Sequence, residues 1–154
     1  METVVIEKTP GYGREEVMHG MRRLLSPLGG MGAFVKPGEK VLLKPNMLSA
    51  KRPDEAVTTH PEVVRAVIEL VLEAGGIPLV GDSPGVGGLA RVAEKSGLAA
   101  VVRETGASLV AFEDPMDVPG KGLFRRIAVA RPYLEADRVI NLPKLKTHGM
   151  MTMT

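Results

Sequence analysis

Short apolar segments recur along this chain of 154 residues, and helical patterns separate most of them. The clearest apolar segments are 40–43, 77–80, 108–112 and 138–141. Helical spacing of apolar residues covers 14–28 and the stretch after Pro61, and a further helical stretch runs from about Leu89 to Gly106. Strands that alternate with helices pair in parallel, because each crossover returns the chain to the same edge of the sheet. The sequence therefore predicts a Rossmann-like, three-layer α/β/α sandwich with a mostly parallel sheet.

Capping and helix-breaking residues predict where the elements begin and end. Thr59 is placed to cap a helix, Glu62 to complete the capping box, and Pro61 suits the first turn. Glycines at 75–76 are expected to close the same helix, and Gly97 to interrupt the next one. The remaining expected elements are a strand over 3–7, a polar loop over 113–122, a strand over 126–130 and a helical turn over 132–136.

Length and composition indicate one domain with an aliphatic core. We expect residues 1–154 to form a single α/β domain, since this length suits one hydrophobic core. Two Tyr, three Phe and no Trp leave the core to aliphatic side chains. The formal net charge is only +2 and the basic pairs are scattered, which argues against nucleic acid as a partner.

Cysteine and long apolar runs are both missing from the sequence. Without cysteine the chain can form neither a disulfide nor a thiolate metal site, and it cannot bind an iron–sulfur cluster through cysteine. No apolar run reaches the roughly 18 residues of a membrane span, and no signal-peptide pattern opens the sequence. We therefore expect a cytoplasmic protein without a membrane partner, and we assign no metal ligands.

Polar clusters follow three of the apolar segments directly. They are 44–46 (Lys-Pro-Asn), 81–84 (Gly-Asp-Ser-Pro) and 141–148, which ends in Lys-Thr-His. In an open parallel sheet the carboxyl ends of the strands share one edge, and ligands bind in the crevice where the strand order reverses. The three clusters are therefore expected to converge, although they lie far apart in the sequence.

The side chains of these clusters suit an anionic ligand. They supply three ammonium groups and several neutral hydrogen-bonding groups, and the first helical turns nearby are expected to add free N–H groups. The predicted ligand-binding residues are Lys44, Asn46, Thr59, Ser83, Asn141, Lys144 and Lys146. Lys144, Lys146 and His148 alternate along an extended segment, which places them on one face.

Asp82 and His148 are the candidate catalytic residues. His148 can act as an acid, a base or a ligand, because imidazole titrates near neutral pH. Asp82 can bind a metal, accept a hydrogen bond from a ribose or an amine, act as a base, or simply cap the turn after it. The glycine-rich loop over 81–88 lacks the spacing of a P-loop and of a dinucleotide fingerprint, so its phosphate signal is weak. His19 and His60 are interpreted as surface or capping histidines.

Four motifs in order carry a resemblance to a known family. They are 41–46 (VLLKPN), 58–64 (TTHPEVV), 81–84 (GDSP) and 141–148 (NLPKLKTH). Through them nearly the whole chain resembles the family catalogued as domain of unknown function 362. The resemblance implies bacterial or archaeal proteins, many with a ferredoxin-like module and the label of iron–sulfur cluster-binding protein. It implies no settled reaction and no established catalytic residue, and a likeness to nickel-dependent lactate racemase is an analogy of fold alone.

The resemblance also frames the hypotheses for function. Family members usually continue past the segment that ends at His148, so the resemblance implies the N-terminal part of a longer family domain. One hypothesis is an enzyme, redox-linked, that acts on a small anionic metabolite with an unspecified cofactor. The others are a non-catalytic module beside a ferredoxin-type domain, and a fragment whose site needs a missing half. An uncovered edge on the last strand would favour pairing with a second copy, which predicts a homodimer.

Overall fold

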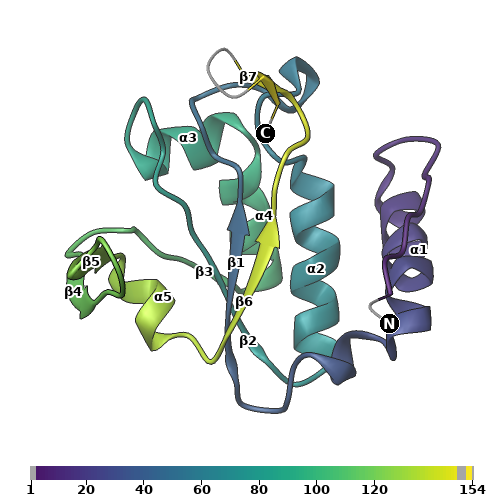
Figure 1. Ribbon diagram of the computed structural model, residues 1–154. Helices are drawn as coiled ribbons and strands as arrows, with labels where there is room; N and C mark the ends of the chain where they lie inside the picture. The colour runs from purple at the N-terminus through teal and green to yellow at the C-terminus, as the bar shows by residue number, and fades with distance from the viewer. Residues whose placement is uncertain (1–2, 149–151, 154) are drawn as a thin grey trace.

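A four-stranded parallel sheet forms the centre of the molecule (Figure 1). The computed structural model describes residues 3–148 and 152–153. The strand order is β3-β2-β1-β6, and all three pairings are parallel. The strands are β1 (Lys40–Pro45), β2 (Ile77–Val80), β3 (Ser108–Leu109) and β6 (Arg138–Leu142). The predicted Rossmann-like α/β class with a mostly parallel sheet is confirmed.

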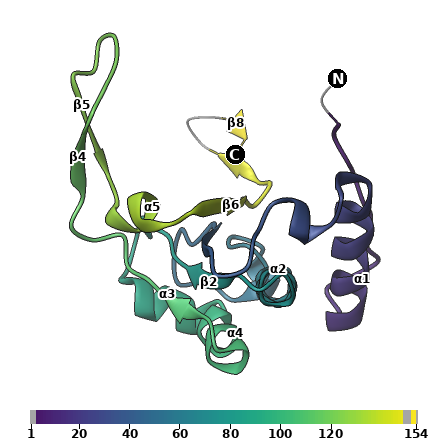
Figure 2. The same cartoon turned by 90° about the horizontal axis from the view of Figure 1, so that it is seen from below.

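Helices cover the two faces of this sheet unequally (Figures 1 and 2). On one face α2 (Pro61–Glu73) contacts β1 and β2, α4 (Leu98–Thr105) packs beside it, and α1 (Arg14–Leu25) packs on its outer side. The short α3 (Leu89–Lys95) joins the same core. On the other face α5 (Arg131–Glu135) contacts β1. The sheet therefore has one thickly covered face and one thinly covered face.

The core lies between α2, α4 and the thickly covered face of the sheet. The side chains that fill it are aliphatic, as the composition predicted. Fully buried examples are Val41, Leu43 and Val80 from the strands and Val64, Ile68 and Val71 from α2. Each such side chain contributes roughly 1.5–3 kcal/mol through its burial. This core positions the ends of β1 and β2 against the start of α2.

Several predicted boundaries agree closely with the structure. The stretch 14–28 forms α1 followed by a 3₁₀ turn at Ser26–Leu28, and two further 3₁₀ turns span Met31–Ala33 and Pro53–Glu55. Gly97 separates α3 from α4, as expected, and its φ of 80° suits glycine. The last strand and the turn before it also fall where the pattern placed them. Within the described residues, the longest apolar helix falls short of what a membrane crossing requires.

Other predictions were wrong, because local propensity does not supply a neighbouring strand. The β-branched run 3–7 has no ladder partner and leaves Val4 and Ile6 largely exposed. The expected strand 108–112 is shortened to β3. The expected loop 113–122 contains β4 (Met116–Pro119), which pairs antiparallel with β5 (Arg126–Val129) in a hairpin.

β1 also runs two residues further than the sequence predicted, through Lys44 and Pro45. The N–H of Gly81 donates to the carbonyl of Leu43, so the backbone N–H and carbonyl groups of odd-numbered residues of β1 point toward β2. Pro45 therefore turns its nitrogen, which carries no hydrogen, to a side where β2 has already ended at Val80. The proline costs no ladder hydrogen bond at this position.

Candidate functional site

The strand order reverses between β1 and β6. From β1 the chain continues to β2 and then β3 on one side, whereas β6 lies on the other side of β1. The register pairs Lys44 with Asn141 and Pro45 with Leu142 at the carboxyl ends of the two strands. A parallel α/β sheet binds its ligands at such a point. The predicted clusters around positions 44 and 141 therefore meet at the switch point.

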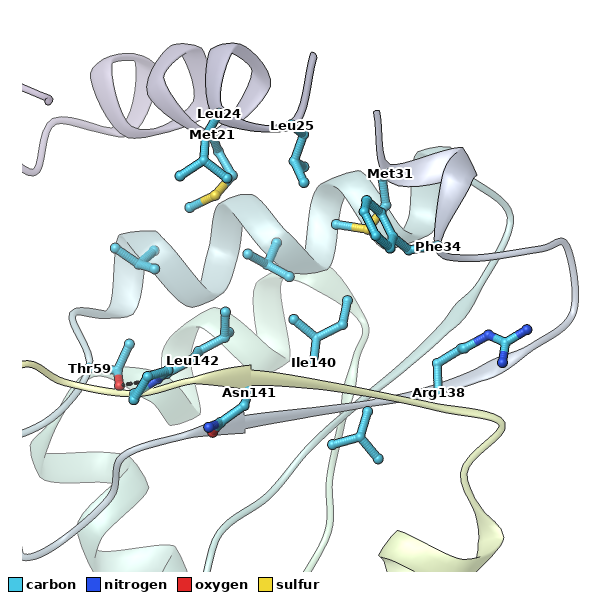
Figure 3. A pocket seen from close by; sticks show the side chains of 14 residues that line it. Met21, Leu24, Leu25, Met31, Phe34, Thr59, Arg138, Ile140, Asn141 and Leu142 are labelled. Carbon is cyan, nitrogen blue, oxygen red and sulfur yellow. Dashed lines mark hydrogen bonds between the residues drawn. The ribbon is translucent and has the colours of Figure 1, made fainter. Parts of the chain in front are cut away.

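Thr59 ties the ends of β1 and β6 to the start of α2. Its hydroxyl accepts a hydrogen bond from the N–H of Asn46 at 2.9 Å. It donates one to the carbonyl of Leu142 at 2.6 Å, and Figure 3 shows these two residues side by side. Its own N–H donates to the carbonyl of Asn46 at 3.1 Å. The side chain is buried, and its hydroxyl both accepts and donates a hydrogen bond. The prediction that Thr59 caps the helix was wrong, because its hydroxyl joins two strands instead.

His60 is the residue that caps α2. Its Nδ1 accepts a hydrogen bond from the N–H of Glu62 at 3.2 Å, and its ring stacks on Tyr12 with centroids 3.9 Å apart. Burial lowers the pKa of His60, the charge of Lys144 lowers it further, and the charge of Glu62 opposes both. The neutral imidazole is therefore favoured. The first turn of α2 does not offer the Glu62 N–H to a ligand, contrary to the expectation from the sequence.

Lys44 and Asp82 form an ion pair that joins the end of β1 to the end of β2. Lys44 Nζ lies 2.7 Å from Asp82 Oδ1, and Asp82 Oδ2 accepts a hydrogen bond from the N–H of Met47 at 2.7 Å. Only 6% of Asp82 is exposed, and both of its oxygens have partners. The partners come from β1 and the residues after it, so the carboxylate fastens two strand ends together.

Lys144 and Lys146 are held by neutral groups instead. Lys146 Nζ donates to Asn46 Oδ1 at 2.9 Å and lies 3.4 Å from the carbonyl oxygen of Val57. Lys144 Nζ lies 3.5 Å from the hydroxyl of Tyr12 and 5.8 Å from the centroid of its ring. Within the described residues, no carboxylate lies within ion-pair distance of either ammonium group. Neither ammonium group beside the switch point is therefore paired with a carboxylate of the described residues.

The remaining predicted site residues are Asn141, Ser83 and His148. Asn141 and Ser83 are exposed, Asn141 on β6 and Ser83 directly after Asp82. His148 lies in the short β7 (Thr147–His148), which pairs with β8 (Thr152–Met153), and its side chain lies outside the described part of the structure. The expectation that it shares a face with the two lysines therefore stays a prediction.

Sequence reasoning missed Tyr12 and Thr58. We call the carboxyl ends of β1, β2 and β6, with the residues that follow them, the rim. Tyr12 reaches this rim from a segment before α1. It is one of only two tyrosines, but no periodic pattern in the sequence singles it out. Thr58 is buried beside Thr59, and its hydroxyl has no hydrogen-bond partner among the residues that the structure describes. An unpaired buried hydroxyl costs free energy. No pattern in the sequence reveals it, because its burial and its partners depend on the tertiary structure.

An apolar groove of about 590 Å³ runs from this rim along β6 (Figure 3). Met21, Leu24 and Leu25 of α1 line one side, and Ile140 and Leu142 of β6 line the floor. Its remaining walls come from α2 and from residues around Met31 and Phe34.

The structure is therefore a Rossmann-like α/β fold, and Lys44, Lys144 and Lys146 lie beside its switch point. The profile of the family described as "Domain of unknown function (DUF362)" matches residues 41–154, and the chain belongs to this family. It is 42% identical over 154 residues to the protein named "Thylakoid-associated protein sll1697" from Synechocystis sp. (strain ATCC 27184 / PCC 6803 / Kazusa). That match covers 100% of this chain and 48% of the relative, so the chain spans about half the relative's length. No solved structure matches the chain.

Proposed function

We propose that the rim at the carboxyl ends of β1 and β6 binds a small anion that carries a carboxylate or phosphate group. The observation that supports this most is the state of Lys144 and Lys146, whose ammonium groups are held by neutral oxygens and meet no carboxylate within the described residues. A cation that is already positioned loses little side-chain entropy when an anion arrives. The switch point is also where this type of sheet binds ligands.

The other rim residues would make further contacts with the anion. Asn46, Asn141 and Ser83 would donate neutral hydrogen bonds to the anion. Lys44 is balanced by Asp82 and would contribute no net attraction until the ion pair opens. If the anion takes Asp82's place beside Lys44, the freed carboxylate becomes a base for proton transfer, with His148 as the other candidate. That sequence of events is the enzymatic form of the proposal.

A non-catalytic module is the other form of the same proposal. In that case the rim would hold an anion or cofactor for a ferredoxin-type partner, which would bring its own cluster because this chain has no cysteine. Turnover distinguishes the two forms, since a module would bind the anion and return it unchanged.

Isothermal titration calorimetry and thermal unfolding with inorganic phosphate, malonate and 2-oxoglutarate test the proposal, with sodium chloride at equal ionic strength as the reference. An anion at about 100 times its Kd should raise the free energy of unfolding by roughly 2.7 kcal/mol. Lys146→Gln should abolish this gain. The matched control is Lys121→Gln, which removes an exposed lysine from the loop between β4 and β5.

The proposal fails if none of these anions stabilises the protein beyond sodium chloride. It also fails if Lys121→Gln removes the gain as fully as Lys146→Gln, because the effect would then be one of overall charge. Which anion binds best separates a preference for phosphate from one for carboxylate.

A further inference from the structure

β6 lacks the cover that its neighbour has. Four of the six residues of β1 are buried, whereas none of the five residues of β6 is. Among the described residues, every buried one lies between Val17 and Val102. Strands of a parallel sheet are ordinarily covered on both faces and flanked by other strands. Within the described residues, the side of the molecule that carries β6 therefore lacks the cover that β1 has.

The outer edge of β6 is open to hydrogen bonding. Asp137 donates its N–H to the carbonyl of Lys40. The backbone N–H and carbonyl groups of odd-numbered residues in this stretch therefore point toward β1, and those of even-numbered residues point outward. Within the described residues β6 pairs with β1 alone. The outward carbonyl of Leu142 is taken by Thr59, which leaves the N–H and carbonyl groups of Arg138 and Ile140 along the free edge. Neither proline nor lysine blocks that edge.

The groove beside β6 lies where a further strand would fit. α1 packs on the outer side of α2, and its Met21, Leu24 and Leu25 face the groove, whose floor is formed by β6 (Figure 3). A strand added to the edge of β6 would lie below α1 and fill this space with alternate side chains. Phe124 and Ile127 in or beside the β4–β5 hairpin and Leu145 after β6 are exposed apolar residues as well. Figure 2 shows the β4–β5 hairpin on the side of the molecule away from α1, with β8 between them.

We propose that β6 and its groove receive an aliphatic strand from the part of the family polypeptide that lies outside the stretch matched by this chain. The relative that is 42% identical over all 154 residues has more than half of its length outside the match, which is ample for a strand and its connections. With right-handed crossovers, helices on the two sides of a switch point cover opposite faces. A helix that accompanies the added strand would therefore cover the thin face, where α5 lies. This inference concerns the sheet edge and is independent of anion binding.

A two-component binding experiment tests the proposal. The unmatched part of the Synechocystis relative is produced as a separate polypeptide, together with this chain, in the same cells. Size-exclusion chromatography with light scattering should show a 1:1 complex, and calorimetry gives its Kd. The relative's own matched stretch, paired with the same polypeptide, is the positive control.

Proline substitutions show whether the sheet edge makes the contact. Ile140→Pro removes an outward N–H, so it should raise the Kd at least about tenfold. Arg138→Pro makes the same change at an exposed position, and it serves if Ile140→Pro lowers the melting temperature of the chain alone. Leu109→Pro is the matched control on the opposite edge strand, where the N–H of Val110 faces β2 and that of Leu109 faces outward. It should leave the Kd unchanged.

Four results would overturn the proposal. They are no complex with this chain, a complex that both β6 variants leave intact, a complex that Leu109→Pro weakens equally, and a homodimer of this chain that Arg138→Pro dissociates. The last result would assign the edge to a second copy instead.

Discussion

Two lysines at the same rim, Lys44 and Lys146, meet opposite electrostatic environments. Lys44 leaves β1 and reaches the buried carboxylate of Asp82, so that its charge is balanced and the ends of β1 and β2 are joined. Lys146 follows β6 and reaches the amide oxygen of Asn46, so that its charge is not balanced within the described residues. The β1–β2 side of the rim is therefore held together by an ion pair. The β6 side keeps its charge, its groove and its edge available.

The largest expected effect concerns packing on the two sides. Leu43→Ala in β1 should lower the free energy of unfolding by about 2–5 kcal/mol, because the side chain is fully buried and leaves a cavity. Leu142→Ala in β6 should cost less, since that side chain is only partly buried beside the groove. Urea denaturation of both variants measures the difference. Equal losses would mean that β6 is as well packed as β1, and the contrast would be lost.

The next effect concerns the ion pair. Asp82→Asn should lower the free energy of unfolding by about 2–3 kcal/mol, because it leaves the partly buried ammonium group of Lys44 without its counter-charge. Asp54→Asn, at an exposed carboxylate paired with Arg52, is the control and should leave stability almost unchanged, because solvent screens that pair. A thermal melt of each variant is sufficient. A silent Asp82→Asn would show that this carboxylate is free for chemistry.

A smaller effect is expected at the bridge between the two sides. Thr59→Val keeps the shape of the side chain but removes the hydroxyl that joins Asn46 to Leu142. We expect a loss of about 1–2 kcal/mol, because the N–H of Asn46 loses its partner. Thr59→Val should also accelerate backbone hydrogen exchange more in β6 than in β2. If protection falls equally in both strands, Thr59 supports the whole sheet rather than the attachment of β6.

The smallest effect is a pH dependence on the β6 side. The folded pKa of His60 lies below the ordinary histidine value of about 6.5, so the unfolded chain takes up protons first as the pH falls. The free energy of unfolding should therefore decrease from neutral pH down through the folded pKa and level off below it. His60→Asn keeps an acceptor for the N–H of Glu62 but does not titrate, so it should remove this component. Chemical denaturation at several pH values measures it, and an unchanged pH profile in His60→Asn would refute the assignment.

Much of the fold was predictable because its signals are local. The strand 77–80 and the broken helix after Leu89 follow from apolar runs and from glycines at positions of positive φ. The convergence of the clusters at 44 and 141 was predictable as well, since parallel strands end at one edge. The β4–β5 hairpin was not, because prolines and acidic residues interrupt its alternating pattern.

The partners within the site were beyond prediction from the sequence. The prediction that Thr59 caps α2 failed because Asn46 and Leu142 compete for the same hydroxyl, and Leu142 is 83 residues away in sequence. Tyr12 reaches Lys144 across 132 residues. A hydroxyl or an ammonium group binds whichever partner the fold brings within about 3 Å, and spacing along the chain carries no information on that distance.

The amino-acid sequence alone determined the alternation of strands and helices, the aliphatic core, the edge at which polar residues gather and the family. These properties follow from periodicity, turn residues and the geometry that every parallel sheet shares. Tertiary structure alone decided that Lys44 pairs with a carboxylate whereas Lys146 meets none within the described residues. It also decided that, among those residues, the outer edge of β6 stays unpaired beside an apolar groove. The physical reason is that charge balance and burial depend on which distant segments come into contact.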